Sequence, residues 1–188
     1  KDGQPKKAPH VINNSWGCPE SEGCNGKEIL PVLKSLKAAG IMVVASAGNE
    51  GSRCSTIGDQ PASHSDTTFS VGASNHRSNN SIVGFSSRGP SVFDKKIGPD
   101  VVAPGSNIRS AVKGGRYSSM SGTSMAGPHV VGLVALLWSA DKTFVGKVDK
   151  TAKLIQKAAI KKTSGETCGG VAGSKIPNNT YGWGAIDA

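Results

Sequence analysis

The segment with the strongest chemical signal spans residues 121–129 and reads SGTSMAGPH, directly before a long apolar stretch. Ser124 would lie at the N-terminus of a helix, where free N–H groups and the helix dipole stabilise negative charge. Gly122 lacks a side chain and would let a substrate backbone approach closely. These features suit a serine that attacks a carbonyl carbon. The alternative is that Thr123 or Ser124 only caps the helix.

The elements that would position this serine alternate along the chain. Apolar residues at helical spacing predict a helix over 27–39 that stops at Gly40. A second helix is expected over 123–139, and it is apolar nearly all round, which predicts a central, buried position. A hairpin is expected to join two strands around Gly114 and Gly115. Short apolar runs predict the strands, at 10–13, 41–45, 69–73, 101–103, 108–112 and 116–120.

Strand, helix and strand in this order predict a parallel α/β sheet with helices on its faces. Such sheets bind ligands beyond the carboxyl ends of their strands. Two glycine-containing breaks follow the strands at 10–13 and 41–45. We therefore expect both breaks to open at the same edge of the sheet.

Composition and charge narrow the class of protein. The chain has 188 residues, of which 36% are hydrophobic and 19% charged, a globular composition that argues against disorder. Aromatic residues make up 5%, too few for a nucleic-acid stacking platform. No apolar stretch approaches the roughly 20 residues of a membrane span, and the first residues lack an apolar signal-peptide run. We therefore expect neither nucleic acid nor membrane as a partner.

The net charge of +9 includes four lysines spaced by three or four residues, Lys150, Lys153, Lys157 and Lys161. On a helix they would share one face, opposite a set of apolar residues. A polyanion-binding stripe is one interpretation. A solvated outer face of a packed helix is favoured, because no arginine cluster or interleaved aromatic accompanies the lysines.

The four cysteines, Cys18, Cys24, Cys54 and Cys168, include no C-x-x-C pair, so zinc spacing is absent. Two disulfides fit, which would imply an oxidising compartment. Three pairings are possible. Cys18 with Cys24 encloses a short loop and is the favoured local bridge, and Cys54 with Cys168 follows by elimination. Reduced, buried cysteines are the alternative.

Five ordered segments resemble the subtilisin-like serine proteases (subtilases). GTSMAGPHV at 122–130 resembles the family's nucleophile motif, and VVASAGNEG at 43–51 its oxyanion-hole segment. NSWG at 14–17 resembles its substrate-binding strand, and APG at 103–105 and the final YGWGAIDA match further family patterns. The resemblance runs from about residue 9 to the last residue. It implies a partial subtilisin-like, three-layer α/β fold with a mostly parallel sheet flanked by helices.

The resemblance also implies roles at the matching positions. Ser124 would form an acyl-enzyme, and the side-chain amide of Asn49 would donate to the oxyanion beside the Ser124 backbone N–H. Asn49 as a plain turn residue is the alternative. Thr123 would assist the oxyanion, and Trp16 would either wall an apolar pocket or belong to the core. The residues expected to line the cleft are Ser15, Trp16, Gly17, Ser46, Ala47, Gly48, Gly122 and Thr123.

One part of the family pattern is absent. The triad order is Asp, His, Ser, and neither the D-[ST]-G nor the H-G-T motif occurs here. His129 lies five positions after Ser124, about 140° around a helix from it, and is expected to be structural. His10, His64 and His76 have no orienting motif. We therefore expect residues 1–188 to be the C-terminal portion of one subtilase (peptidase S8-like) catalytic domain, with the Asp and His motifs on an upstream segment.

The leading hypothesis is a serine endopeptidase portion that another polypeptide segment completes and that is nearly inert alone. The alternatives are a noncatalytic subtilase-like module that binds peptides or proteins, and a transfer enzyme that uses the same acyl intermediate. Expected partners are a polypeptide substrate, the missing N-terminal half, and a propeptide or inhibitor. No cofactor is expected for the chemistry. Structural calcium is common in the family, but the sequence locates no site for it. The expected location is secreted or otherwise oxidising and extracytoplasmic.

Overall fold

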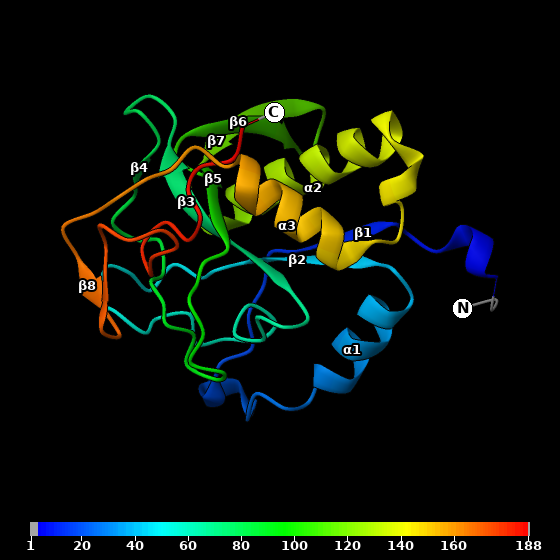
Figure 1. Ribbon diagram of the computed structural model, residues 1–188. Coiled ribbons are helices and arrows are strands. Elements are labelled where there is room, and N and C mark those ends of the chain that lie inside the picture. Colours follow the sequence, from blue (N-terminus) through cyan, green and yellow to red (C-terminus); the bar gives the residue numbers. More distant parts are fainter. Residues whose placement is uncertain (1–3, 188) are drawn as a thin grey trace.

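The computed structural model describes residues 4–187, and its centre is a five-stranded sheet (Figure 1). Residues 1–3 and 188, including the last residue of the YGWGAIDA segment, lie outside the described part. Four strands are parallel, with Ile12 opposite Val43 and Val71 opposite Val101. The remaining strand, β4, is short and pairs antiparallel with the end of β3. The strands are β1 (Val11–Asn14), β2 (Met42–Ser46), β3 (Phe69–Asn75), β4 (Ser81–Ile82) and β5 (Val101–Pro104).

Helices flank this sheet, as the sequence predicted. Two helices, α2 and α3, cover one face, and α1 lies against β2 on the other side (Figure 1). The predicted hairpin is present, with Ile108 opposite Met120. The helices are α1 (Leu30–Ala38), α2 (Thr123–Ala140) and α3 (Val148–Ala158), with the 3-10 turns η1 (Pro5–Lys7), η2 (Glu20–Glu22) and η3 (Lys142–Phe144). The remaining strands are β6 (Ile108–Val112), β7 (Arg116–Met120), β8 (Thr167–Cys168) and β9 (Val171–Ala172).

The main core lies between the sheet and the inner face of α2. Residues four apart on α2 share one side of the helix and point at the strands. Their neighbours from β2, β3 and β5 are mostly valine and alanine, with Met42 and Phe69 at the strand starts, which suits strands buried on both faces. The Trp138 indole N–H donates to the Thr151 hydroxyl at 2.8 Å and ties α2 to α3. The inner-face residues of α2 are Ala126, Val130, Val134 and Trp138.

The first helix is shorter than the predicted 27–39, because it begins at Leu30. The carboxylate of Glu28 accepts hydrogen bonds from the backbone N–H groups of Asn25 and Lys27 and holds these residues in a turn. Pro31 then occupies the first turn of the helix, where its missing N–H costs no bond. The predicted stop is present, since Gly40 adopts a φ of +76°.

The second helix is central, as predicted, because α2 packs on β1, β2, β3 and β5, but the prediction that it is buried is only half right. The inner face of α2 is buried, but its outer face is open, and Leu136 is 65% exposed. The reason is that the described residues contain no second layer over this face. By length and apolar composition α2 would also suit a membrane span, the one helix of the described residues that does. Core helices pass the same test, and α2 packs on a sheet as a core helix does.

The predicted lysine face is only partly helical. Lys150, Lys153 and Lys157 lie on α3, but the helix ends at Ala158, before Lys161. The Lys161 ammonium donates to the backbone carbonyl groups of residues 156 and 157 and lies 5.5 Å from the Trp183 ring centroid. Lys161 therefore closes the end of the helix and does not extend its charged stripe.

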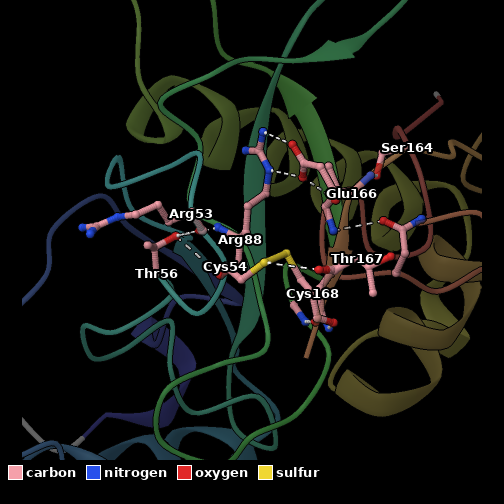
Figure 2. The surroundings of a disulfide bond; sticks show 12 residues. Arg53, Cys54, Thr56, Arg88, Ser164, Glu166, Thr167 and Cys168 are labelled. Carbon is pink, nitrogen blue, oxygen red and sulfur yellow. Dashed lines mark hydrogen bonds and ion pairs between the residues drawn. A yellow bond between two sulfur atoms is a disulfide. The ribbon is translucent and has the colours of Figure 1, made fainter. Parts of the chain in front are cut away.

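The two disulfides have the pairing expected from the sequence. Cys18 is joined to Cys24 across a separation of six residues, with 5.8 Å between the Cα atoms. Cys54 is joined to Cys168 across 114 residues, with 5.3 Å between the Cα atoms. This long bridge connects the loop after β2 to the C-terminal segment and lies beside the buried guanidinium of Arg88 (Figure 2).

Candidate active site

The breaks after β1 and β2 open at the same edge of the sheet, as predicted, and the start of α2 meets them there. Together they enclose a cavity of about 120 Å³, which we call the edge cavity. Ser124 and Asn49 both line it, although they are 75 positions apart in the sequence. Its lining residues are Ser15, Trp16, Gly17, Ser46, Ala47, Gly48, Asn49, Glu50, Asp59, Ala62, Thr123 and Ser124.

The orientation of the Asn49 amide follows from its partners. The backbone N–H of Thr123 donates to Asn49 Oδ1 at 2.9 Å, and the Thr123 hydroxyl donates to the same oxygen at 3.0 Å. A backbone N–H can only donate, so the atom that faces it must be the amide oxygen. The Nδ2 group of Asn49 is thereby turned to the other side, and a methyl group built on Gly122 would lie 3.9 Å from it. The buried Thr123 side chain holds the amide in place.

Ser124 is the second residue of α2, and its surroundings leave its hydroxyl available. Its backbone carbonyl accepts a hydrogen bond from the Ser15 hydroxyl at 3.1 Å. The Ser46 hydroxyl donates to the carbonyl of Thr123 at 3.0 Å. Within residues 4–187, no side chain or backbone group forms a hydrogen bond with Ser124 Oγ. The two strand ends therefore hold the backbone of the helix start without engaging the serine hydroxyl.

Gly127 lies where α2 meets the end of β1. A methyl group at this position would lie 2.7 Å from Asn13 Oδ1, so an alanine here would displace the Asn13 side chain. Glycine therefore lets α2 lie against β1 with the Asn13 amide in its present position. This packing brings Ser124 to the carboxyl ends of β1 and β2.

The segment after β1 is open to solvent. Trp16 is 51% exposed, and its indole N–H donates to Asn14 Oδ1 at 3.2 Å. Its side chain is part of the cavity wall, so the alternative of a core tryptophan is wrong. Ser15 and Gly17 are exposed as well, which leaves this stretch of backbone accessible to a ligand.

The described histidines do not supply a base at Ser124. The ring Nδ1 of His129 is bonded to the Met125 carbonyl of its own helix at 2.9 Å. His10 packs against Trp138, and His64 is buried against Phe93. None of the histidines in residues 4–187 lines the edge cavity.

Three residues that no sequence motif marked as functional also line the edge cavity, Glu50, Asp59 and Ala62. Glu50 directly follows Asn49, a signal that was available, whereas Asp59 comes from a loop with no local motif. Burial raises the pKa of the Asp59 carboxyl, and the negative charges of Glu50 and Glu22 raise it further. Ser87 donates to the Glu50 carboxylate at 2.8 Å.

Over residues 4–187, no group of three or more His, Cys, Asp or Glu side chains is placed to hold a metal ion. Glu50 and Asp59 are two carboxylates, fewer than the oxygen ligands that Ca²⁺ takes. No cluster of acidic side chains in residues 4–187 therefore marks a site for structural calcium.

The model of the subtilase family matches residues 4–184 of this chain. Bacillopeptidase F from Bacillus subtilis (strain 168) is 35% identical over 192 residues, which cover 98% of this chain and 12% of that protein. Subtilisin E from the same strain is 41% identical over 136 residues, or 71% of this chain and 32% of subtilisin E. The solved structure of Sphericase superposes with a TM-score of 0.77 and 25% identity, covering 95% of this chain and 56% of its own. The chain thus spans less than two thirds of each of these proteins.

Proposed function

Since this chain belongs to the subtilase family of serine proteases, we propose that it carries the nucleophile and the oxyanion site of a serine endopeptidase. The observation that supports this most is the convergence of Ser124 and Asn49 on one cavity, with the Asn49 oxygen held by Thr123 and its N–H groups left to donate. A module that only binds peptides would need neither a free serine hydroxyl nor a fixed amide donor beside it.

In the proposed reaction, Ser124 Oγ attacks the carbonyl carbon of a peptide bond and loses its proton to a general base. The carbonyl oxygen becomes negative and accepts hydrogen bonds from Asn49 Nδ2 and from the Ser124 backbone N–H. The positive end of α2 stabilises the same charge. The base then protonates the leaving amine, which leaves the acyl group on Ser124 Oγ, and water hydrolyses this ester to free acid and serine.

The substrate would lie in extended form along the two strand ends. Residues 15–17 expose their backbone at the cavity and can pair with a peptide as an added strand, and residues 46–48 form the opposite wall. Gly122 would leave room for the scissile carbonyl beside the amide of Asn49.

The base and its orienting carboxylate would come from an upstream segment that carries the Asp and His motifs. Two open surfaces support this. Within the described residues β1 pairs only with β2, so one edge of the sheet is unpaired. The outer face of α2 is also exposed, and a cavity of about 270 Å³ lies between Val11 and Ala135. Further strands and helices placed here would complete the sheet and cover α2.

The two disulfides support location in a secreted or otherwise oxidising, extracytoplasmic compartment, because such bonds persist there. A propeptide or protein inhibitor would occupy the same cleft as the substrate.

The test uses the full-length parent protein, which includes the upstream segment, and a fluorophosphonate probe that reacts with activated serines. We expect labelling at Ser124 and its loss in Ser124→Ala, with kcat for a peptide substrate lowered by about 10⁶, the loss already established for a subtilisin. Ser118→Ala, an exposed serine on β7 outside both cavities, is the control and should keep probe labelling and peptide cleavage. A folded, complete protein that resists the probe would favour the binding module. Trapping of the acyl group by added amines in preference to water would indicate a transferase.

A further inference from the structure

The edge cavity has an acidic wall that the proposed reaction does not use. Glu50 and Asp59 both line it, and none of its lining residues is a lysine or arginine. The chain as a whole carries a net charge of +9, so this concentration of negative charge is opposite to the average of the molecule. A cavity with two carboxylates and no cation favours a positively charged occupant.

The carboxylate of Asp59 lies directly against the peptide-binding segment after β1. A methyl group built on Gly17 would lie 2.6 Å from Asp59 Oδ2, so the carboxylate contacts the backbone at Gly17 and a side chain there would displace it. The Glu50 carboxylate is placed in the same way against Gly48, in the segment after β2. The two carboxylates therefore contact the two backbone segments, after β1 and after β2, along which the substrate would lie.

Asp59 has no partner of its own. Throughout the described residues no hydrogen bond or ion pair reaches its carboxylate, whereas Glu50 accepts one from Ser87. Its charged neighbours are Glu50 and Glu22, both negative. A half-buried carboxylate beside two like charges is costly unless a cation accompanies it. An ammonium or guanidinium group in the cavity would supply that cation and would form charge-assisted hydrogen bonds.

The position of the cavity identifies which part of a substrate would enter it. It includes Ser124 and Asn49, so a side chain inside it belongs to the residue that donates the scissile carbonyl. Trp16 adds an exposed aromatic surface at the same wall, which suits the aliphatic stem and the charge of a long basic side chain. A metal ion fits less well, because only two acidic groups meet here.

We propose that the edge cavity is a specificity pocket for lysine or arginine on the acyl side of the scissile bond, with Asp59 as the main counter-charge and Glu50 as the second. This inference rests on the proposed peptidase function, and it names the substrate class of that site.

The test compares peptide substrates that differ only in the residue before the scissile bond, lysine, arginine, glutamine, phenylalanine or leucine, on the full-length protein. We expect kcat/KM for lysine and arginine to exceed that for glutamine by at least tenfold. In Asp59→Asn, the basic substrates should lose about 10–100-fold and the apolar ones should lose less than about threefold. Asp59→Glu should restore part of the preference. Glu22→Gln removes a charge outside the cavity and should change the lysine-to-glutamine ratio by less than about threefold.

A second measurement needs no catalysis. Benzamidine carries a planar cation and no scissile bond, and its affinity for Ser124→Ala should weaken at least tenfold when Asp59→Asn is added. Failure of fluorophosphonate labelling with intact, Asp59-dependent benzamidine binding would reject the peptidase and keep the cationic pocket. Two results would overturn the pocket assignment. One is a kcat/KM for glutamine, phenylalanine or leucine substrates that equals or exceeds that for lysine and arginine. The other is a benzamidine affinity that Asp59→Asn does not change. Displacement of benzamidine by millimolar Ca²⁺ would identify the cavity as a metal-ion site and would also overturn the assignment as a lysine or arginine pocket.

Discussion

Two polar regions of this molecule treat their hydrogen-bonding groups in opposite ways. The C-terminal network, made of Arg88, Glu166, Asn178, Asn179 and Thr180, satisfies its groups internally. Arg88 is 2% exposed, and its Nε donates to Glu166 at 3.0 Å (Figure 2). Thr180 donates to the same carboxylate at 2.8 Å. The amide of Asn178 donates to three backbone carbonyls and accepts from two N–H groups. The edge cavity, by contrast, leaves Ser124 Oγ, Asn49 Nδ2 and Asp59 without partners in the described chain.

The difference separates polar residues that build the fold from those available for a ligand. A buried polar group without a partner destabilises a protein, so a satisfied network contributes to stability and to a unique loop arrangement. Groups left open at the edge of a sheet contribute little to folding but can bind what enters the cleft. Substitutions in the network should therefore act on stability, and those in the cavity on activity.

The largest expected effect on stability is the loss of the Cys54–Cys168 bridge, which anchors the network to the loop after β2. Its 114-residue separation predicts, in the chain-entropy account, a loss of about 5 kcal/mol for the Cys54→Ser, Cys168→Ser pair of changes. The Cys18–Cys24 bridge spans six residues and predicts about 2 kcal/mol. Denaturant unfolding of the two double variants measures both values. Equal losses, or free thiols on all four cysteines in native material, would contradict the assignment.

The next largest effect is on catalysis and comes from a substitution in the edge cavity. Asn49→Ala removes the oxyanion donor, and we expect kcat to fall by about 10²–10³, the range already established for this change in a subtilisin. KM should change little, because the donor acts on charge that develops during the reaction. Steady-state kinetics on the full-length protein measure both constants. The exposed neighbour Ser52→Ala is the control, and an Asn49→Ala enzyme with unchanged kcat would reject the assigned role.

Within the C-terminal network, Arg88→Met should lower the free energy of unfolding by about 3 kcal/mol. The change removes the guanidinium that donates to Glu166 and to the backbone carbonyl of Ser86. The Thr180 hydroxyl and the 38% exposure of Glu166 keep the loss below that of a fully buried pair. Lys96→Met breaks an ion pair of the same kind with Asp66, but on the surface, and should cost less than about 1 kcal/mol. Similar losses in the two variants would show that burial does not set the difference.

The last effect depends on pH and concerns Asp100, a buried carboxylate whose hydrogen bonds lower its pKa and whose burial raises it. It accepts bonds from the Ser70 N–H and hydroxyl and from Gln156, yet burial raises its pKa to about 6 from an ordinary 3.8. Between these values the folded protein holds a proton that the unfolded chain releases, so stability should fall as pH rises from about 4 to 6.5. The loss is at most about 3 kcal/mol.

Unfolding free energies of the native sequence and of Asp100→Asn, measured from pH 4 to 7.5, isolate this contribution, because the other titrating groups are common to both proteins. The difference between the two curves should change across the window and be flat above it. Parallel curves would show that Asp100 keeps an ordinary pKa.

Much of the site could be predicted because its residues carry local signals. Ser124 lies at a helix start that glycine and apolar spacing mark, and Asn49 follows a continuous β-branched run. Parallel strands then bring their carboxyl ends together, which accounts for the meeting of residues 15–17 and 46–48. The burial of α2 was mispredicted, since apolar composition indicates what a face could bury against and not whether a partner covers it. The start of α1 was mispredicted because a side chain, Glu28, competed for the first turn.

The sequence by itself determined the family and most of the strands and helices around the site, because these depend on local pattern and spacing, whereas the structure selected one of three possible cysteine pairings. Only the tertiary structure decided that Asp59 reaches the same cavity as Ser124, 65 positions away, and that Thr123 turns the Asn49 amide. Such placements depend on how loops of no regular period pack against the sheet. That packing is set by many small contacts at once, and no local pattern records it.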